Sequence, residues 1–286
     1  MWAKNKLTQR ITNIKRKYEL RIRNFWLFVN WYDLIPCLPA GRVIRCSKIA
    51  AATLILSTIF TAAAEAQITS GKILFERKTN LYKRFKNEDW VTNWVKEADK
   101  TKVDEFEMYF NDSLTAFKPV ESEEKESYSW MTSKNSVYQN LNTNSRYSIK
   151  DIWRNLIPIS DSLYQRKWKI TDSKRTISGY SCRKAIWEQN DSTRIYAWYC
   201  NEISVSAGPE SFIGLPGMIL GLATEDGGVI YFAKNVQQGQ QDMNNLIPPK
   251  TKEKVLPSAE LRSQLKKQYG KEEWSKEWLR NIFDNW

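Results

Sequence analysis

Residues 214–232 read GLPGMILGLATEDGGVIYF, and the fold expected for the chain follows from this stretch. Pro216 fixes its own φ and Gly217 can adopt the positive φ of a type II turn, so the motif predicts a tight turn that leads into a strand. Residues 218–223 are apolar on both faces. Such a strand is typical of the centre of a sheet that is covered on both sides. The simplest interpretation of the motif is therefore structural rather than ligand-binding.

The next turn sets the register of a hairpin. Asp226 and Gly227 form a two-residue loop between two apolar runs. Counting back along both strands brings Gly221 opposite Phe232. An aromatic ring beside a glycine covers backbone that would otherwise be bare. This pair therefore favours an antiparallel sheet.

The motif resembles the one that names the GLPGLI family, whose members are exported proteins of Bacteroidetes-type bacteria with no assigned activity. The motif residues are Gly214, Leu215, Pro216, Gly217, Met218 and Ile219. Residues 179–185 (GYSCRKA), 197–199 (AWY) and 208–209 (GP) are similar in order and spacing. Met218 stands where the family usually has Leu. The resemblance covers residues 68–236 and implies export and an antiparallel β fold, but it supplies no catalytic residues.

Two of the four cysteines, Cys182 and Cys200, lie after residue 66. Residues 180–189 and 193–201 read as strands joined by a three-residue turn, which would place the two cysteines opposite each other. Opposed positions have Cβ atoms about 4.5 to 5.5 Å apart, near the upper limit for a disulfide. In an oxidising compartment the pair predicts a disulfide. Two buried free thiols are the alternative.

The rest of residues 67–286 is expected to be mainly β, in the α+β class. Alternation of apolar residues predicts strands at 68–79, 103–110, 114–117 and around 128–141, 147–152 and 165–170. Apolar residues at helical spacing predict a short helix near residues 90–98. We expect a curved antiparallel sheet, either a partial barrel or sandwich-like, with a few helices packed against it.

The C-terminal segment, at about residues 258–284, reads as helical. Ser258 follows a proline and is a candidate cap. Trp274, Trp278 and Ile282 recur every four residues. A stripe at this spacing is expected to pack on the sheet. A docking face for a partner is the alternative.

The N-terminal leader has the parts of a secretory signal. A basic stretch at 42–48 precedes an uncharged run at 49–64, and the sequence Ala64-Glu65-Ala66 has small residues at the two positions that signal peptidase reads. A membrane anchor is the alternative, but spanning a bilayer takes about 20 apolar residues. We expect cleavage after Ala66 and a single mature domain, residues 67–286. This domain would be exported without a transmembrane anchor to the periplasm or cell envelope, or secreted.

Composition and charge exclude several function classes. The 286 residues include no His, which removes imidazole as a base or metal ligand, and no metal site is predicted. Residues 1–66 hold 11 of the 44 Lys and Arg but only 3 of the 32 Asp and Glu, so most of the net charge of +12 lies in the leader. A nucleic-acid-binding protein keeps its basic patch on the folded domain. No nucleic-acid partner is therefore expected, and no cofactor is predicted.

Two functions of different class are consistent with these patterns. The first is a non-enzymatic binding module whose concave surface holds a hydrophobic ligand or an envelope protein. Its candidate binding residues are Trp187, Trp198 and Tyr199, in a mature region that is rich in aromatic residues. The alternative is an envelope hydrolase that uses carboxylates, which predicts a deep cleft with a raised carboxyl pKa. The sequence has no Gly-x-Ser-x-Gly nucleophile motif, and it assigns no catalytic residue.

Overall fold

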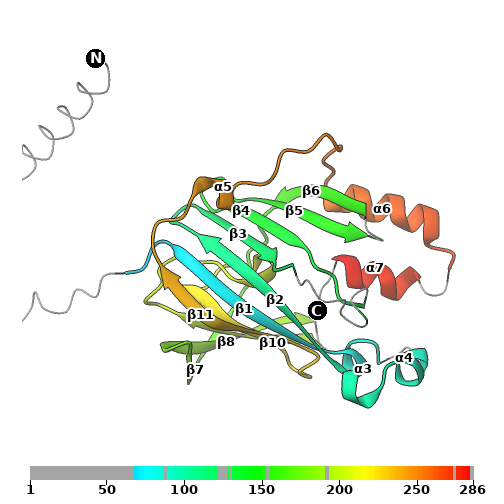
Figure 1. Ribbon diagram of the computed structural model, residues 1–286, viewed down its shortest axis with the longest axis horizontal. Coiled ribbons are helices and arrows are strands. Elements are labelled where there is room, and N and C mark those ends of the chain that lie inside the picture. Colours follow the sequence, from blue (N-terminus) through cyan, green and yellow to red (C-terminus); the bar gives the residue numbers. More distant parts are fainter. Residues whose placement is uncertain are drawn as a thin grey trace, which may run out of the picture. The chain divides into compact units, whose positions relative to one another are not determined.

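The described part of the chain forms one antiparallel sheet of eleven strands (Figure 1). The computed structural model describes residues 67–286 apart from 87–88, 122–127, 129–130, 153–154, 191–192, 273–274 and 284–286. The predicted signal, residues 1–66, lies outside the described residues. The strands are β1 (Gly71–Asn80), β2 (Thr101–Phe110), β3 (Leu114–Pro119), β4 (Ser136–Asn140), β5 (Ser145–Ile152), β6 (Asn155–Ser162), β7 (Lys169–Ile177), β8 (Tyr180–Asn190), β9 (Thr193–Cys200), β10 (Met218–Thr224) and β11 (Val229–Gln238).

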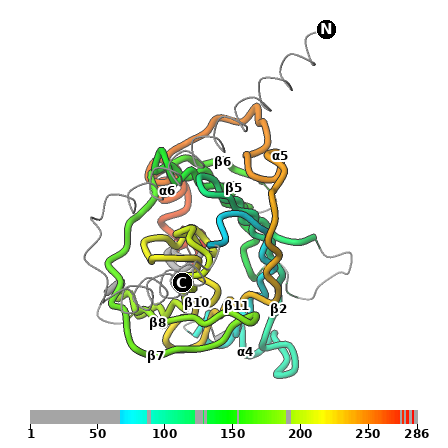
Figure 2. Tube along the Cα trace, turned by 90° about the vertical axis from the view of Figure 1, so that its left-hand side faces the viewer, coloured from blue at the N-terminus to red at the C-terminus, as the bar shows by residue number. Residues whose placement is uncertain are grey.

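The strand order is β6-β5-β4-β3-β2-β1-β11-β10-β9-β8-β7. The chain therefore builds the sheet outward from β1 to β6, crosses to the opposite edge, and returns from β7 to β11 beside β1. Residues 163–168, here named the crossing segment, connect the two edges. Figure 2 shows the sheet curling from β6 and β5, through β2 and β11, to β8 and β7, with the yellow segment before β10 on its inner side. The curved antiparallel sheet and the α+β class are confirmed.

Strands β1 and β2 show how the sheet acquires an apolar inner face. Alternate residues are buried along both strands, and Phe75 of β1 lies opposite Phe106 of β2. Because successive side chains of a strand point to opposite faces, this alternation gathers large side chains on one side. The rings of Phe106 and Phe117 stack there, 4.8 Å apart, in the main hydrophobic core. The strands predicted at 68–79, 103–110 and 114–117 are confirmed.

The motif at residues 214–219 leads into the central strand β10, as predicted. Residues 218–223 are all buried, and β10 pairs with β9 on one side and with β11 on the other. Gly221 lies opposite Phe232, which confirms the register set by the hairpin loop.

The turn before β10 differs from the prediction in its type. Gly217 has the predicted positive φ, 145°, but its N–H bonds to Leu215 O at 2.8 Å. This is a bond between residues two apart, whereas a type II turn closes between residues three apart. The tighter turn carries the chain close to β9, where a Cβ on Gly217 would lie 2.1 Å from Cys200 O.

Strand β6 is missed by the sequence patterns. It contains Pro158, which lowers the expectation of a strand because proline has no N–H to donate. The structure places β6 at an edge of the sheet, where its outer side faces no further strand and bonds to Leu256, through Ser160 N at 3.0 Å and Pro158 O at 3.3 Å. Most of the strand expected at 165–170 is instead the crossing segment, and β7 begins at Lys169.

Short helices complete the fold. They are α3 (Leu81–Arg84), α4 (Asp89–Trp94), α5 (Met243–Leu246), α6 (Ser258–Tyr269) and α7 (Ser275–Phe283), with the 3₁₀ turns η3 (Glu97–Asp99) and η5 (Pro209–Ser211). Helices α6 and α7 pack through Leu261 and Ile282 onto Ile159 of β6, and Trp278 joins the same cluster. Packing, rather than partner docking, is thus confirmed for Trp278 and Ile282. Trp274 lies outside the described residues.

The N-terminus of α6 corrects one sequence prediction. Ser258 is the first residue of the helix and does not cap it with its side chain. Instead, Ser258 N and Oγ both donate to Asp161 Oδ1 of β6, each at 3.0 Å. The cap comes from a residue remote in sequence, which local patterns do not reveal.

Candidate functional site

A cavity of about 370 Å³ lies on the inner face of the sheet. Its wall is made by β4, β5, β6, the crossing segment, β8, η5 and the first turns of α6, with the end of α7. Cationic side chains outnumber carboxylates in this wall, and the charged residues are Arg146, Lys150, Arg166, Arg262 and Glu210. The rings of Trp187 and Phe283 add an apolar part. We name this hollow the inner cavity.

Arg166 enters the inner cavity from the crossing segment. The carbon at the centre of its guanidinium lies 3.8 Å from the centre of the Phe212 ring, and its Nη1 donates to Ser211 O at 3.2 Å. Its Nε has no hydrogen-bond partner among the described residues. Burial, followed by the positive charge of Arg146, lowers the pKa of Arg166 to about 10. Arg166 is nevertheless a cation at neutral pH.

Arg146 reaches the same cavity from β5. It lies opposite Asp161 of β6, and its Nη2 donates to Asp161 Oδ2 at 2.6 Å. Burial alone would raise the pKa of Asp161, but the hydrogen bonds from Ser258 and Arg146 hold it below its usual range. Asp161 is therefore ionised at neutral pH and fixes both Arg146 and the start of α6.

Turn η5 connects the two arginines. Glu210 and Ser211 have φ of 52° and 66°, in the left-handed region that residues other than glycine seldom adopt. Such a conformation costs about 1 to 3 kcal/mol per residue and persists only where surrounding contacts hold it. Ser211 has these contacts, because its Oγ accepts a bond from Arg146 at 3.3 Å and its carbonyl accepts the bond from Arg166. Strained backbone thus sets the spacing of two cations.

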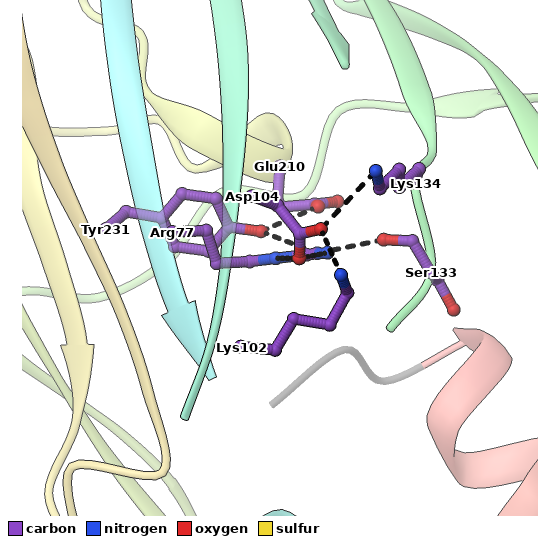
Figure 3. A network of polar contacts seen from close by, with 7 residues as sticks. All are labelled: Arg77, Lys102, Asp104, Ser133, Lys134, Glu210 and Tyr231. Carbon is purple, nitrogen blue, oxygen red and sulfur yellow. Dashed lines mark hydrogen bonds and ion pairs between the residues drawn. The ribbon is translucent and has the colours of Figure 1, made fainter. Parts of the chain in front are cut away.

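Glu210 connects the inner cavity to a buried polar network (Figure 3). The Tyr231 hydroxyl donates to Glu210 Oε1 at 2.9 Å. Arg77 donates in turn to the Tyr231 hydroxyl at 3.3 Å and to Ser133 O at 2.8 Å. Arg77 is buried, and its guanidinium also lies over the ring of Phe106, 4.7 Å from the ring centre.

Asp104 neutralises Arg77 inside this network. Nε and Nη2 of Arg77 lie 3.2 and 2.7 Å from Asp104 Oδ2, and the Nζ atoms of Lys102 and Lys134 each lie 3.5 Å from Oδ1. Burial alone would raise the pKa of Asp104, but the charge and hydrogen bonds of Arg77, with the two lysines, hold it below its usual range. The network thus fixes Glu210 through the Tyr231 hydroxyl, which bonds to both Arg77 and Glu210.

The aromatic residues predicted to form a binding surface do not lie together. Trp187 lines the inner cavity. Trp198 packs against Phe232, with ring centres 5.7 Å apart, and Tyr199 is buried in the core. Trp198 and Tyr199 are neighbours on one strand, so they point to opposite faces of the sheet. The structure thus brings one of the three to the cavity.

The predicted disulfide is absent, and Cys182 and Cys200 are buried free thiols. The register of β8 and β9 is the one expected from Glu188 opposite Arg194 to Arg183 opposite Tyr199, although at the turn Asn190, and not Gln189, lies opposite Thr193. Beyond Arg183 and Tyr199, Cys182 is bonded in register with Arg175 of β7, and Cys200 with Met218 of β10. The register of β8 and β9 contains no pair of the two cysteines, and the alternative of the sequence analysis, two buried free thiols, holds.

Arg146, Arg166, Glu210 and Ser211 carry the site, and sequence reasoning missed all of them. The pattern of β5 is one reason, because Ser148 and Lys150 are buried on the inner face while Tyr147 and Ile149 are not. A pattern that assigns apolar residues to the core orients this strand the wrong way. Buried polar residues in a strand would have indicated the site, but their burial is known only once the fold is known.

Two searches of the described residues gave negative results. No group of three or more Cys, Asp or Glu side chains that could hold a metal ion occurs in the described ranges. Within those same ranges, none of the helices combines the length and the apolar character needed to cross a bilayer.

Comparison with known proteins finds a family of unknown function. The family described as "Protein of unknown function (Porph_ging)" matches residues 187–221, which include Trp187, η5 and the motif at 214–219. No curated protein matches the chain significantly. The name suggested by the GLPGLI motif stays a prediction.

Solved structures give only distant likenesses. Two structures of PNGF-II, in space groups P21 and C2, are 17% and 18% identical to the chain, with TM-scores of 0.47 and 0.46 over 68% and 65% of it. The chain spans only 32% and 31% of the length of those proteins. An uncharacterized conserved protein from Thermus thermophilus is 9% identical, with a TM-score of 0.37 over 72% of this chain and 99% of that one.

Proposed function

We propose that residues 67–286 act in the cell envelope as a non-enzymatic binding protein, exported by the leader and released from it after Ala66. The ligand would lie in the inner cavity. The observation that carries the proposal is the way this cavity is built. Segments from both edges of the sheet meet there, and the strained turn η5 is held between Arg146 and Arg166. Strained backbone clusters at ligand-binding sites.

The apolar part of the cavity wall supports the expectation of a hydrophobic ligand. Val137, Ile159, Trp187 and Phe283 line the inner cavity beside its charged residues. Pockets for small molecules are typically lined by apolar and aromatic groups with a few polar groups that orient the ligand. We infer that the ligand has an apolar body, as the sequence suggested, together with a polar group.

The carboxylates at the inner cavity favour binding over the alternative, a hydrolase. Carboxylate-dependent hydrolysis needs one carboxyl group with a raised pKa to donate a proton. Asp161 has a lowered pKa, and both of its oxygens accept hydrogen bonds. Glu210 accepts a bond from Tyr231. Both groups thus serve to fix neighbouring elements.

Native mass spectrometry of the protein purified from its own cell envelope tests this function. We expect the mass of a chain that begins at Gln67, with added mass that is lost on denaturation. The variant Ala259→Trp fills the cavity at the first turn of α6 and should lose the added mass. Its control is Glu260→Trp, because Glu260 is exposed on the same turn and does not line the cavity. A bare wild-type chain, or cargo retained by Ala259→Trp, would contradict the proposal.

A further inference from the structure

We propose that the inner cavity holds its ligand through an oxyanion, namely a carboxylate, sulfate or phosphate group, placed between Arg146 and Arg166. This inference rests on the proposed binding function and names the chemistry of its ligand. A guanidinium presents its N–H donors in a planar fork that matches such groups. An apolar body attached to the anion would lie against Trp187 and Phe283.

Charge balance is the first step. Other arginines of the described residues are paired with carboxylates: Arg77 with Asp104 at 2.7 Å, Arg146 with Asp161 at 2.6 Å, Arg194 with Glu188 at 3.1 Å and, more loosely, Arg183 with Asp172 at 4.0 Å. Within the described part of the chain, no such pair involves Arg166. Its contacts include the rings of Phe212, Trp187 and Tyr164, at 3.8, 5.1 and 5.3 Å from the guanidinium carbon, and the backbone oxygens of Tyr164 and Ser211. Arg166 is half-buried, and a cation that is partly removed from water without a counterion is unfavourable, so an anionic ligand would supply what the protein does not.

The second step is the arrangement of the two cations. Arg146 and Arg166 come from β5 and from the crossing segment, and both donate to Ser211. Their charges repel, since the charge of Arg146 lowers the pKa of Arg166. Like charges held together by hydrogen bonds to one strained residue form a site prepared for an anion, because the ligand then removes the repulsion.

Helix α6 adds to the positive potential. Ser258 and Ala259, in its first turn, line the inner cavity. The N-terminus of a helix carries a partial positive charge and favours anions. Asp161 already accepts two bonds from Ser258 there and is paired with Arg146, so an anion between the two arginines is expected to lie nearer to Arg166.

A second hollow is also lined by cations, but it differs from the inner cavity in the partners that these cations have. It measures about 230 Å³ and is lined by Lys83, Arg194 and Asp226 among others. Two of its cations have close partners, because Lys83 Nζ donates to Asp226 O at 2.6 Å and Arg194 bonds to Glu188 and Glu225. Arg194 is therefore the matched control for Arg166.

Isothermal titration calorimetry of the exported protein, dialysed free of cargo, tests the inference with 1-naphthyl phosphate and with neutral 1-naphthol. We expect the phosphate to bind at least about tenfold more tightly than the naphthol, since a hydrogen bond to a charged group contributes about that factor or more. The variant Arg166→Met should lose about tenfold or more in affinity for 1-naphthyl phosphate, whereas Arg194→Gln should bind it as the wild type does. Inorganic phosphate should compete.

A second variant guards against misfolding. Arg166→Lys keeps the charge but not the fork, and we expect an affinity between those of the wild type and Arg166→Met. Equal affinity for the two naphthyl probes, or full affinity of Arg166→Met for 1-naphthyl phosphate, would overturn the oxyanion site. The proposed binding function would still be tested separately, by native mass spectrometry of the wild type and Ala259→Trp. Failure of all three probes to bind the wild type would also overturn the oxyanion site. Cargo lost by Ala259→Trp would then show that a neutral ligand uses the cavity.

Discussion

Arg146 and Asp161 lie opposite each other on β5 and β6, and a 2.6 Å ion pair joins their side chains on the inner face of the sheet. Because the other oxygen of Asp161 accepts two bonds from Ser258, one carboxylate links the inner cavity to helix α6. A substitution of Asp161 should therefore affect both the inner cavity and the start of helix α6.

Asp161→Asn should lower the free energy of unfolding by about 2 kcal/mol, since it weakens a charge-assisted hydrogen bond and a helix cap. Urea denaturation measures the loss. Asp172→Asn is the control, because the Asp172 side chain is fully exposed and lies 4.0 Å from Arg183. An exposed pair contributes about 1 kcal/mol or less. Equal losses in the two variants would contradict the structural role of Asp161.

The stability of the wild type should decrease on acidification. The pKa of Asp161 and that of Asp104 are lowered in the folded state, so the stability they contribute is present above their unfolded pKa, about 4, and is lost as the pH falls through their folded pKa. The unfolding free energy should change little through these groups between pH 7 and pH 5, and fall below about pH 4. The gap between wild type and Asp161→Asn should narrow over the same range. A gap that stays constant down to pH 2 would argue against an ionised Asp161.

Asp104→Asn should be the most damaging of the charge changes. Removal of one partner from a buried ion pair costs about 3 to 5 kcal/mol, because the other charge is left uncompensated. Glu107→Gln is its control on the same strand, since the Lys72–Glu107 pair is partly exposed and should contribute about 1 kcal/mol at most. Thermal or urea unfolding of both variants distinguishes the buried network from the surface pair.

Gly217→Ala should destabilise the fold more than Gly179→Ala. Both glycines have positive φ, 145° and 86°, but a Cβ on Gly217 would meet Cys200 O while a Cβ on Gly179 meets no atom within 4 Å. We expect about 1 to 2 kcal/mol of backbone strain for Gly179→Ala and a clearly larger loss for Gly217→Ala. Comparable unfolding midpoints would mean that the motif is kept for a reason other than this close approach.

The two cysteines should be unreactive in the folded protein. Burial raises the pKa of Cys182 to about 12 and also raises that of Cys200, so the reactive thiolates are scarce at pH 8. Mass spectrometry of residues 67–286 after iodoacetamide treatment should find two alkyl groups in denaturant and none under native conditions. A chain that takes up no alkyl group in denaturant until a reductant is added would contain a disulfide.

Local patterns predicted much of the sheet. The alternation in β1 and β2, the loop at Asp226 and Gly227, and the apolar run of β10 each involve neighbouring residues. The strands are confirmed, and so is the register of the hairpin that the loop joins. These patterns did not predict the edge strand β6, because Pro158 lowers the expectation of a strand. The side-chain partner at the start of α6 was lost because that partner, Asp161, is 97 residues from Ser258.

The sequence by itself determined the class of the fold and the central strand, since turn chemistry and the alternation of apolar residues act over a few residues. Only the tertiary structure decided the inner cavity. Arg166 meets Ser211 across 45 residues and Arg146 meets it across 65. The crossing segment that permits this contact forms neither a strand nor a helix, although the sequence pattern predicted a strand at 165–170. Charges buried on an inner face are recognisable only when the sheet has curved around them, because burial depends on every strand at once.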